Sequence, residues 1–141
     1  MTKIDFYILR EARANQRLRT ACRIAEKAYL RGHLVHIHTD SRDGASRLDD
    51  LLWTFRDCSF IPHGIENQDP QVCPVSIGCG WVPEKCEVLI NLAAEVPMFF
   101  SRFERVAEIV DQDQANRESG RQHYRFYRDR GYSLQHHEIS P

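Results

Sequence analysis

The chain has 141 residues, the length of one ordinary domain, with 42% apolar and 28% charged residues, as is typical of soluble globular proteins. No apolar run approaches the roughly 20 residues that span a bilayer, and the apolar segment at the N-terminus is too short for a signal peptide, so we expect a cytoplasmic protein without a membrane partner. A formal net charge of -1 argues against the whole molecule as a binder of duplex DNA, and any electrostatic function must come from uneven placement of charge.

The first elements predict a buried strand followed by an amphipathic helix. Residues 4–9, IDFYIL, are rich in β-branched and aromatic side chains, as is typical of a buried strand. The helix after it ends at Gly32, because glycine readily adopts the backbone conformation that closes a helix. Its apolar face is formed by side chains at helical spacing: Leu18, Ala21, Cys22, Ala25, Ala28 and Tyr29.

A second strand and helix follow. Residues 34–39, LVHIHT, predict a strand, and the side chain of Asp40 or Ser41 can cap the next helix by accepting a backbone N–H. The apolar positions of that helix are Ala45, Leu48, Leu52 and Phe55. After it, we expect the segment 63–74 to be a long surface loop.

The second half of the chain predicts more strands and one long helix. Its apolar stretches predict strands at residues 74–79 and 87–92. Residues 106–110 fit a strand or the end of a helix, and a strand is favoured. A helix is predicted from Asp113 to Arg130, closed by Gly131, and a final strand over residues 132–137. Asp111 and Asp113 are expected to stabilise the start of the helix, where its dipole favours negative charge.

This order of elements is typical of an open α/β sheet covered by helices. We predict a single domain over residues 1–141, a mostly parallel open sheet flanked by helices and Rossmann-like in element order. The nucleotide fingerprint of such folds is absent, because the stretch from Leu9 to Arg13 has no glycine that would let the backbone approach a pyrophosphate. No G-x-x-x-x-G-K-[ST] segment occurs either, so no nucleotide cofactor is predicted.

The sequence offers no catalytic constellation. Asp49 and Asp50 are neighbours on a predicted helix and point about 100° apart, so they cannot share a substrate. No serine or cysteine lies in a nucleophile-elbow sequence. We therefore predict a protein that is not an enzyme.

The alternative is a small zinc- or nucleotide-dependent enzyme that uses histidines and cysteines. His36 and His38 alternate on a predicted strand, so their rings face one side of the sheet. Structural zinc sites bring their ligands in close pairs, and neither C-x-x-C nor H-x-x-x-H spacing occurs. The favoured interpretation is that both rings line the sheet, and no metal site is predicted. The five cysteines are Cys22, Cys58, Cys73, Cys79 and Cys86.

The last predicted helix carries a basic face. Four of its residues fall within one arc of roughly 80°: Arg117, Arg121, Arg125 and Arg128. Tyr124 borders this arc, and Gly120 lets the helix pack closely on the sheet. Guanidinium groups bind carboxylates in a bidentate manner, while the ring can receive an apolar group. The face therefore suits an acidic ligand with an apolar end, although such faces are often only solvated.

Four segments resemble the family of the chi subunit of bacterial DNA polymerase III, in the same order over nearly the whole chain. They are DFY at residues 5–7, RLDDLLWTFRDCSFIPHG at 47–64, VLINL at 88–92 and R-x-x-YRFYRDRGYSL at 121–134. The resemblance implies an α/β fold without catalytic activity or cofactor. It also implies two binding faces, one for the psi subunit of the clamp-loader complex and one for single-stranded-DNA-binding protein.

For the second face, the resemblance implies binding of the acidic C-terminal tail of single-stranded-DNA-binding protein, which ends in a phenylalanine carboxylate. Arg121 matches the key arginine of the family, and Arg117 and Arg125 match flanking basic positions. Tyr124 matches the adjacent tyrosine, and Val110 matches an apolar wall at the end of the preceding strand.

For the psi face, the resemblance favours Trp53, Phe60 and Pro62 as contacts. Aromatic residues next to a proline in a loop are good interface anchors, whereas Trp53 on a helix is equally compatible with ordinary core packing. A repair helicase is a further candidate partner for the Phe60 face.

Overall fold

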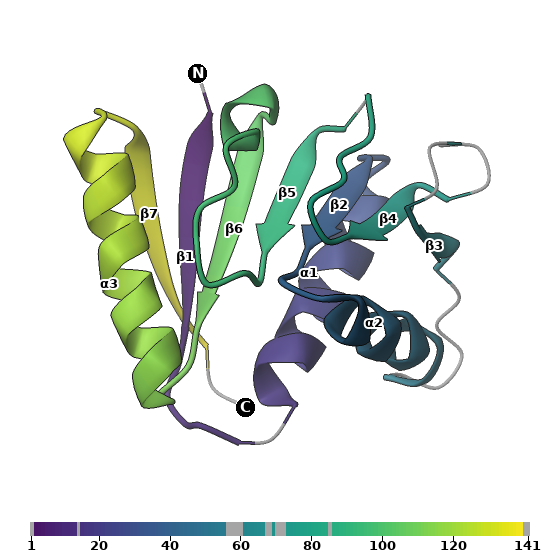
Figure 1. The fold of residues 1–141 in the computed structure, drawn as a ribbon, viewed down its shortest axis with the longest axis horizontal. Helices are drawn as coiled ribbons and strands as arrows, with labels where there is room; N and C mark the ends of the chain where they lie inside the picture. The colour runs from purple at the N-terminus through teal and green to yellow at the C-terminus, as the bar shows by residue number, and fades with distance from the viewer. Residues whose placement is uncertain are drawn as a thin grey trace.

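The computed structural model describes residues 2–13, 15–55, 61–66, 69, 73–84 and 86–139. Its strands are β1 (Lys3–Leu9), β2 (Val35–His38), β3 (His63–Ile65), β4 (Val75–Gly78), β5 (Val88–Asn91), β6 (Arg105–Val110) and β7 (Ser133–Ile139). They form one seven-stranded sheet in the order β3-β4-β2-β5-β6-β1-β7 (Figure 1). All pairings between neighbouring strands are parallel, which confirms the predicted open α/β sheet.

The described helices cover both faces of this sheet. They are α1 (Gln16–Leu30), α2 (Arg42–Thr54), α3 (Gln114–Asp129) and the short 3-10 helix η1 (Phe100–Arg102). Successive side chains of a strand point to opposite faces, so the sheet has two apolar cores. One core joins the sheet to α1 and α2, and the other joins it to α3 and η1.

The α1 and α2 core follows the predicted helical spacing. Ala21, Cys22 and Ala25 of α1 are fully buried, and their small side chains let the helix approach the sheet closely. The start of α2 is capped by Ser41, whose Oγ accepts the backbone N–H of Gly44 at 3.0 Å. Of the two caps that the sequence allowed, the serine is the one used.

The structure differs from the prediction at the segment 63–74. His63–Ile65 is not loop but forms the edge strand β3, with His63 aligned to Val75 of β4. A strand of only three residues with a glycine in the middle has too few side chains to show alternation, so its pattern could not be read from the sequence.

The C-terminal elements lie close to their predicted places. Helix α3 covers 114–129 with Asp113 as its N-cap, and the final strand runs to Ile139 instead of ending at residue 137. No helix among the described residues is long and apolar enough to cross a membrane.

Candidate functional site

The start of α3 is held by two aspartates at the end of β6. The Asp113 side chain accepts the backbone N–H of Asn116, as an N-cap does. Asp111 Oδ1 accepts the backbone N–H of Asp113 at 3.1 Å and the side-chain amide of Asn116 at 2.8 Å. The expected role of both carboxylates is confirmed, and their contacts fix where α3 leaves the sheet.

Close packing of α3 on β6 depends on Gly120. A Cβ atom at this position would lie 2.7 Å from Cγ2 of Val110, too short for a carbon contact, and 3.1 Å from its Cγ1, which is tight. Gly120 is therefore needed where the helix backbone passes over the end of the strand. The exposed side of α3 next to this contact borders a groove.

This groove, which we call the arginine groove, has a volume of about 370 Å³. The five residues predicted for an acidic tail all line it: Val110, Arg117, Arg121, Tyr124 and Arg125. Arg128, the fourth arginine of the predicted arc, also lines it. The structure thus brings the predicted set together in one concave site.

The guanidinium groups of the groove have few acidic partners. Arg121 Nη1 lies 3.9 Å from Glu118 Oε2, and both side chains are more than half exposed, so this pair is weak. Arg128 has a contact of 3.4 Å with the neighbouring Asp129. Within the described part of the chain, neither Arg117 nor Arg125 lies within ion-pair distance of a carboxylate. The groove consequently presents positive charge that an acidic ligand can neutralise.

An aromatic floor lies beneath these arginines. Phe6 of β1 meets Tyr124 edge to face, with ring centroids 5.7 Å apart, and stacks on His136 of β7 at 6.0 Å. Tyr124 and His136 are themselves 5.2 Å apart. Such a cluster can receive an aromatic or aliphatic side chain at the apolar end of a ligand.

Several lining residues were missing from the sequence prediction. They are Phe6, Ile8, Gln112 and His136. Strand alternation places Phe6 and Ile8 on one face of β1, but the sequence has no signal that this face lies under α3. That relationship arises from the sheet order, in which β1 lies between β6 and β7.

Of the residues predicted for the psi subunit, Trp53 and Pro62 are described, and they lie at the other edge of the sheet. Trp53 of α2 is 48% exposed, and its ring packs on His63 of β3 with centroids 4.4 Å apart. Pro62 directly precedes β3 and is half-buried, whereas Phe60 lies outside the described residues. Because β3 and β7 are the two edge strands, this surface is separated from the arginine groove by the width of the sheet (Figure 1).

His36 and His38 lie on one side of β2, as their alternation predicted. His36 Nδ1 is 2.8 Å from Ser76 Oγ, and the ring stacks on Phe103. Burial, together with the nearby His38, lowers the pKa of His36 to about 3, so the ring is neutral near pH 7. The ring of His38 packs on Phe99. Both rings therefore belong to an aromatic cluster.

Four of the five cysteines lie in the described part of the chain, as free thiols: Cys22, Cys73, Cys79 and Cys86. Burial raises the pKa of both Cys22 and Cys86 to about 12, so these thiols stay protonated. Cys58 lies outside the described residues. Among the residues that the structure describes, no three or more His, Cys, Asp or Glu side chains are grouped as metal ligands would be.

Comparison with known proteins gives consistent matches along the chain. Residues 1–135 match the family described as "DNA polymerase III chi subunit, HolC". The chain is 43% identical over 140 residues to the DNA polymerase III subunit chi of Pseudomonas aeruginosa, covering 99% of this chain and 98% of the relative. It is 29% identical over 134 residues to the subunit chi of Haemophilus influenzae, covering 92% of each chain. The subunit chi of Escherichia coli is 29% identical over 118 residues, covering 80% of this chain and 79% of the relative.

Proposed function

The chain belongs to the DNA polymerase III chi subunit family, and on this premise we propose that it is a non-catalytic adaptor of the DNA polymerase III holoenzyme. In this proposal one face binds the psi subunit, which connects the protein to the clamp loader. The other face binds the acidic C-terminal tail of single-stranded-DNA-binding protein. The adaptor acts in the cytoplasm and tethers the replication complex to protein-coated single-stranded DNA.

The observation that carries the proposal is the composition of the arginine groove. Arg117, Arg121 and Arg125 project from successive turns of α3 beside the rings of Phe6 and Tyr124. A peptide tail with several carboxylates and a terminal phenylalanine offers the complementary groups. Its carboxylates can pair with guanidinium groups while its ring packs against the aromatic floor.

The expected binding free energy gives a low affinity for a single tail and a high combined affinity when many tails are present. Hydrogen bonds to charged groups contribute about 1.5 to 3 kcal/mol each, but on an exposed rim they are screened by salt. Single-stranded-DNA-binding protein coats DNA in many copies, so a released tail is quickly replaced by another at high local concentration. The proposed tether therefore gains its strength from multivalent attachment.

The separation of the two faces supports a linking role. Trp53 and Pro62 lie near the β3 edge, while the arginine groove lies near β7, so two partners can bind without competing for the same surface. We assign the psi subunit to the Trp53 side, together with Phe60. A repair helicase is a candidate competitor there, because one exposed aromatic surface can serve more than one partner.

A pull-down tests the proposed function. The immobilised protein is incubated with full-length single-stranded-DNA-binding protein or with a form that lacks its last few residues. We expect capture of the full-length form alone, with less capture as salt is raised. Equal capture of the truncated form would contradict the tail assignment, and capture of neither would contradict the adaptor function. Bare single-stranded DNA serves as a control that should not be retained.

A further inference from the structure

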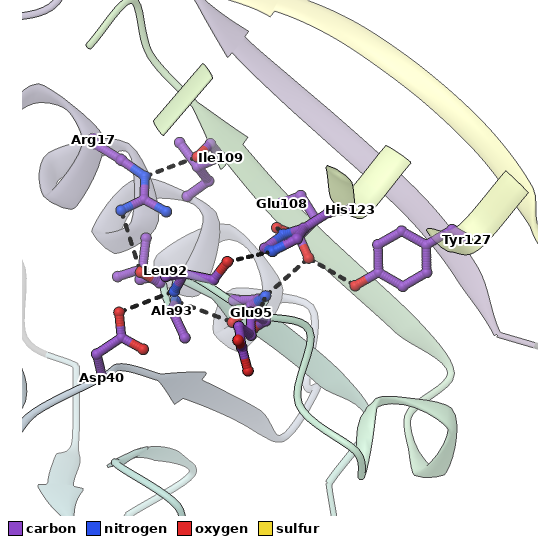
Figure 2. Close-up of polar contacts among 11 residues, drawn as sticks. Arg17, Asp40, Leu92, Ala93, Glu95, Glu108, Ile109, His123 and Tyr127 are labelled. Atoms are coloured by element: carbon purple, nitrogen blue, oxygen red, sulfur yellow. Dashed lines mark hydrogen bonds and ion pairs between the residues drawn. The ribbon is translucent and has the colours of Figure 1, made fainter. Parts of the chain in front are cut away.

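A buried carboxylate beneath α3 connects three elements of the fold. Glu108 of β6 is buried and accepts three hydrogen bonds, of which the one from Tyr127 is drawn in Figure 2. Its Oε1 lies 2.8 Å from Nδ1 of His123, and its Oε2 accepts the Tyr127 hydroxyl at 2.7 Å and the Asn91 amide at 2.9 Å. Two of these donors belong to α3 and one to β5, so Glu108 joins this helix to the sheet by polar contacts.

When Glu108 is ionised, the surroundings of His123 require a doubly protonated ring. Its Nδ1 faces the carboxylate of Glu108, and its Nε2 lies 2.8 Å from the carbonyl oxygen of Ala94. Both neighbours can only accept hydrogen bonds, and only the imidazolium form donates from both nitrogens. A neutral ring would leave one of the two oxygens facing a lone pair in a buried site. The side chains of His123 and Glu108 are 6% and 3% exposed, so water cannot readily replace the missing donor.

The charged groups around His123 favour the same state. Burial alone lowers the pKa of His123, but the hydrogen bond and charge of Glu108 and the Ala94 carbonyl oppose this and raise the pKa above its ordinary value. Arg17 of α1 acts in the opposite direction, at longer range, while donating to the carbonyl oxygens of Ile109 and Leu92.

Two further groups complete the surroundings of this pair. Burial and the charge of Glu108 raise the pKa of Tyr127, which therefore stays a neutral donor. The carboxylate of Asp40 accepts the backbone N–H of Ala94 at 2.9 Å and so helps to hold the segment that receives the His123 hydrogen bond (Figure 2).

His123 is also placed to control the arginine groove. On α3 it lies three residues after Gly120, on the same buried side as Tyr127, and between Arg121 and Arg125 in sequence. A shift of this part of the helix would move both arginines relative to Val110 and Phe6, which belong to the sheet. The arginines of the groove lie on α3, whereas Phe6, Val110 and His136 lie on β1, β6 and β7, so the shape of the groove depends on how this helix and the sheet are joined.

We propose that His123 is a positioning residue of the arginine groove: its imidazolium joins α3 to β6 and to Ala94, and loss of its proton weakens the binding of an acidic peptide. This inference rests on the proposed function for the identity of the ligand, but the charge state of His123 can be tested without any ligand. It adds a pH dependence to the groove that its arginines cannot supply, because guanidinium groups stay charged throughout the physiological range.

The direction of the pH effect follows from the raised pKa. A group whose pKa is higher in the folded protein stabilises the fold fully below its unfolded value, about 6.5 for histidine, and loses this contribution as the pH rises through the folded value. Peptide affinity should therefore fall on going from mildly acidic to alkaline solution. The carboxylates of the peptide do not cause this change, since their pKa values near 4 lie well below the window.

The binding test is a fluorescence-anisotropy titration with a labelled acidic peptide that ends in phenylalanine, from about pH 6 to about pH 9 at constant ionic strength. His136 also lines the groove, so every protein in the series carries His136→Gln to remove this second histidine from the binding site. The series compares this parent with His123→Asn, which keeps a donor toward Glu108 but does not titrate. A matched control, Tyr127→Phe, removes one hydrogen bond to Glu108 and leaves His123 intact.

We expect the parent to lose about three- to tenfold in affinity across this range, the scale of one buried hydrogen bond. Tyr127→Phe should retain this pH dependence, whereas His123→Asn should bind with an affinity that does not depend on pH. If the role of His123 were purely structural, each variant would lose affinity by the same factor at every pH. A flat profile in the parent, or an unchanged profile in His123→Asn, would overturn the proposal.

The second measurement is the NMR titration of the His123 ring nitrogens in the wild-type protein without peptide, which remains informative if His123→Asn fails to fold. We expect the ring to lose its second proton at a higher pH than an exposed histidine does, and loss of that proton at the same or a lower pH would overturn the inference. If the peptide does not bind the wild-type protein at any pH, the proposed function is wrong. The proposed effect of His123 on peptide binding is then wrong as well. The ring spectrum still decides the charge state of His123 in that case.

Discussion

Gly120 of α3 lies directly against Val110 of β6, so closely that a Cβ atom on the glycine would stand 2.7 Å from Val110 Cγ2. The contact sets the distance between the helix that carries the arginines and the strand that ends in the wall of the groove. It also makes the groove sensitive to a single methyl group.

Gly120→Ala should therefore destabilise the protein and weaken peptide binding. Overpacking of this kind costs about 1 to 3 kcal/mol, of which the better helix propensity of alanine recovers up to about 1 kcal/mol. Urea denaturation measures the change in the free energy of unfolding. The matched rescue is Gly120→Ala with Val110→Ala, which removes both clashing methyl groups and should regain part of the lost stability. If Gly120→Ala alone is as stable as wild type, α3 does not depend on this contact.

Arg121→Ala should weaken binding of the acidic peptide about tenfold or more, because it removes a charge-assisted contact of about 1.5 to 3 kcal/mol. The side chain is 62% exposed, so the thermal unfolding temperature should hardly change. Fluorescence anisotropy at two salt concentrations measures the effect, and the lost affinity should be smaller at high salt. The control is Arg23→Ala, which removes an exposed arginine from α1, a helix that belongs to the other core of the sheet. Equal affinities for Arg121→Ala and wild type would remove Arg121 from the site.

Trp53→Ala should reduce capture of the psi subunit while leaving peptide binding unchanged, since Trp53 and the arginine groove lie at opposite edges of the sheet. Truncation of an aromatic anchor in an interface typically costs 2 kcal/mol or more of binding free energy. A pull-down with psi and an anisotropy titration with the peptide are made on the same preparation. Because the ring also packs on His63, circular dichroism is needed to show that the variant is folded. Loss of both activities would point to a folding defect and not to a local interface.

The stability of the protein should fall in mild acid because of His36. Its pKa is lowered to about 3 in the folded protein, whereas an unfolded histidine titrates near 6.5, so the unfolded state binds more protons between these values. The contribution of His36 is complete above pH 6.5 and decreases as the pH falls toward 3. His36→Phe keeps a ring among Trp81, Phe99 and Phe103 and should show a shallower loss of stability over this window in urea denaturation. Parallel curves for the two proteins would show that another group governs the acid response.

The sequence by itself determined the features that depend on local spacing. Helical periodicity placed Arg117, Arg121 and Arg125 on one face, and Asp113 marked the start of the helix, because both depend on residues a few positions apart. The order of strands and helices was enough to predict an open α/β sheet. The similarity in residue order along the chain was enough to predict the chi family, to which the chain belongs.

Only the tertiary structure decided which distant residues meet at the site. Phe6 and His136 are 130 positions apart in the numbering, and they form one aromatic floor because β1 and β7 pair in register. Nothing in the sequence around Glu108 indicates that this strand residue is a buried hydrogen-bond acceptor. In the structure it accepts hydrogen bonds from side chains of β5 and α3. Local spacing reports which side of an element is apolar, but not which element will cover it. The order of the strands in the sheet determines which element covers each apolar side. This order places the arginine groove where α3 crosses the end of β6.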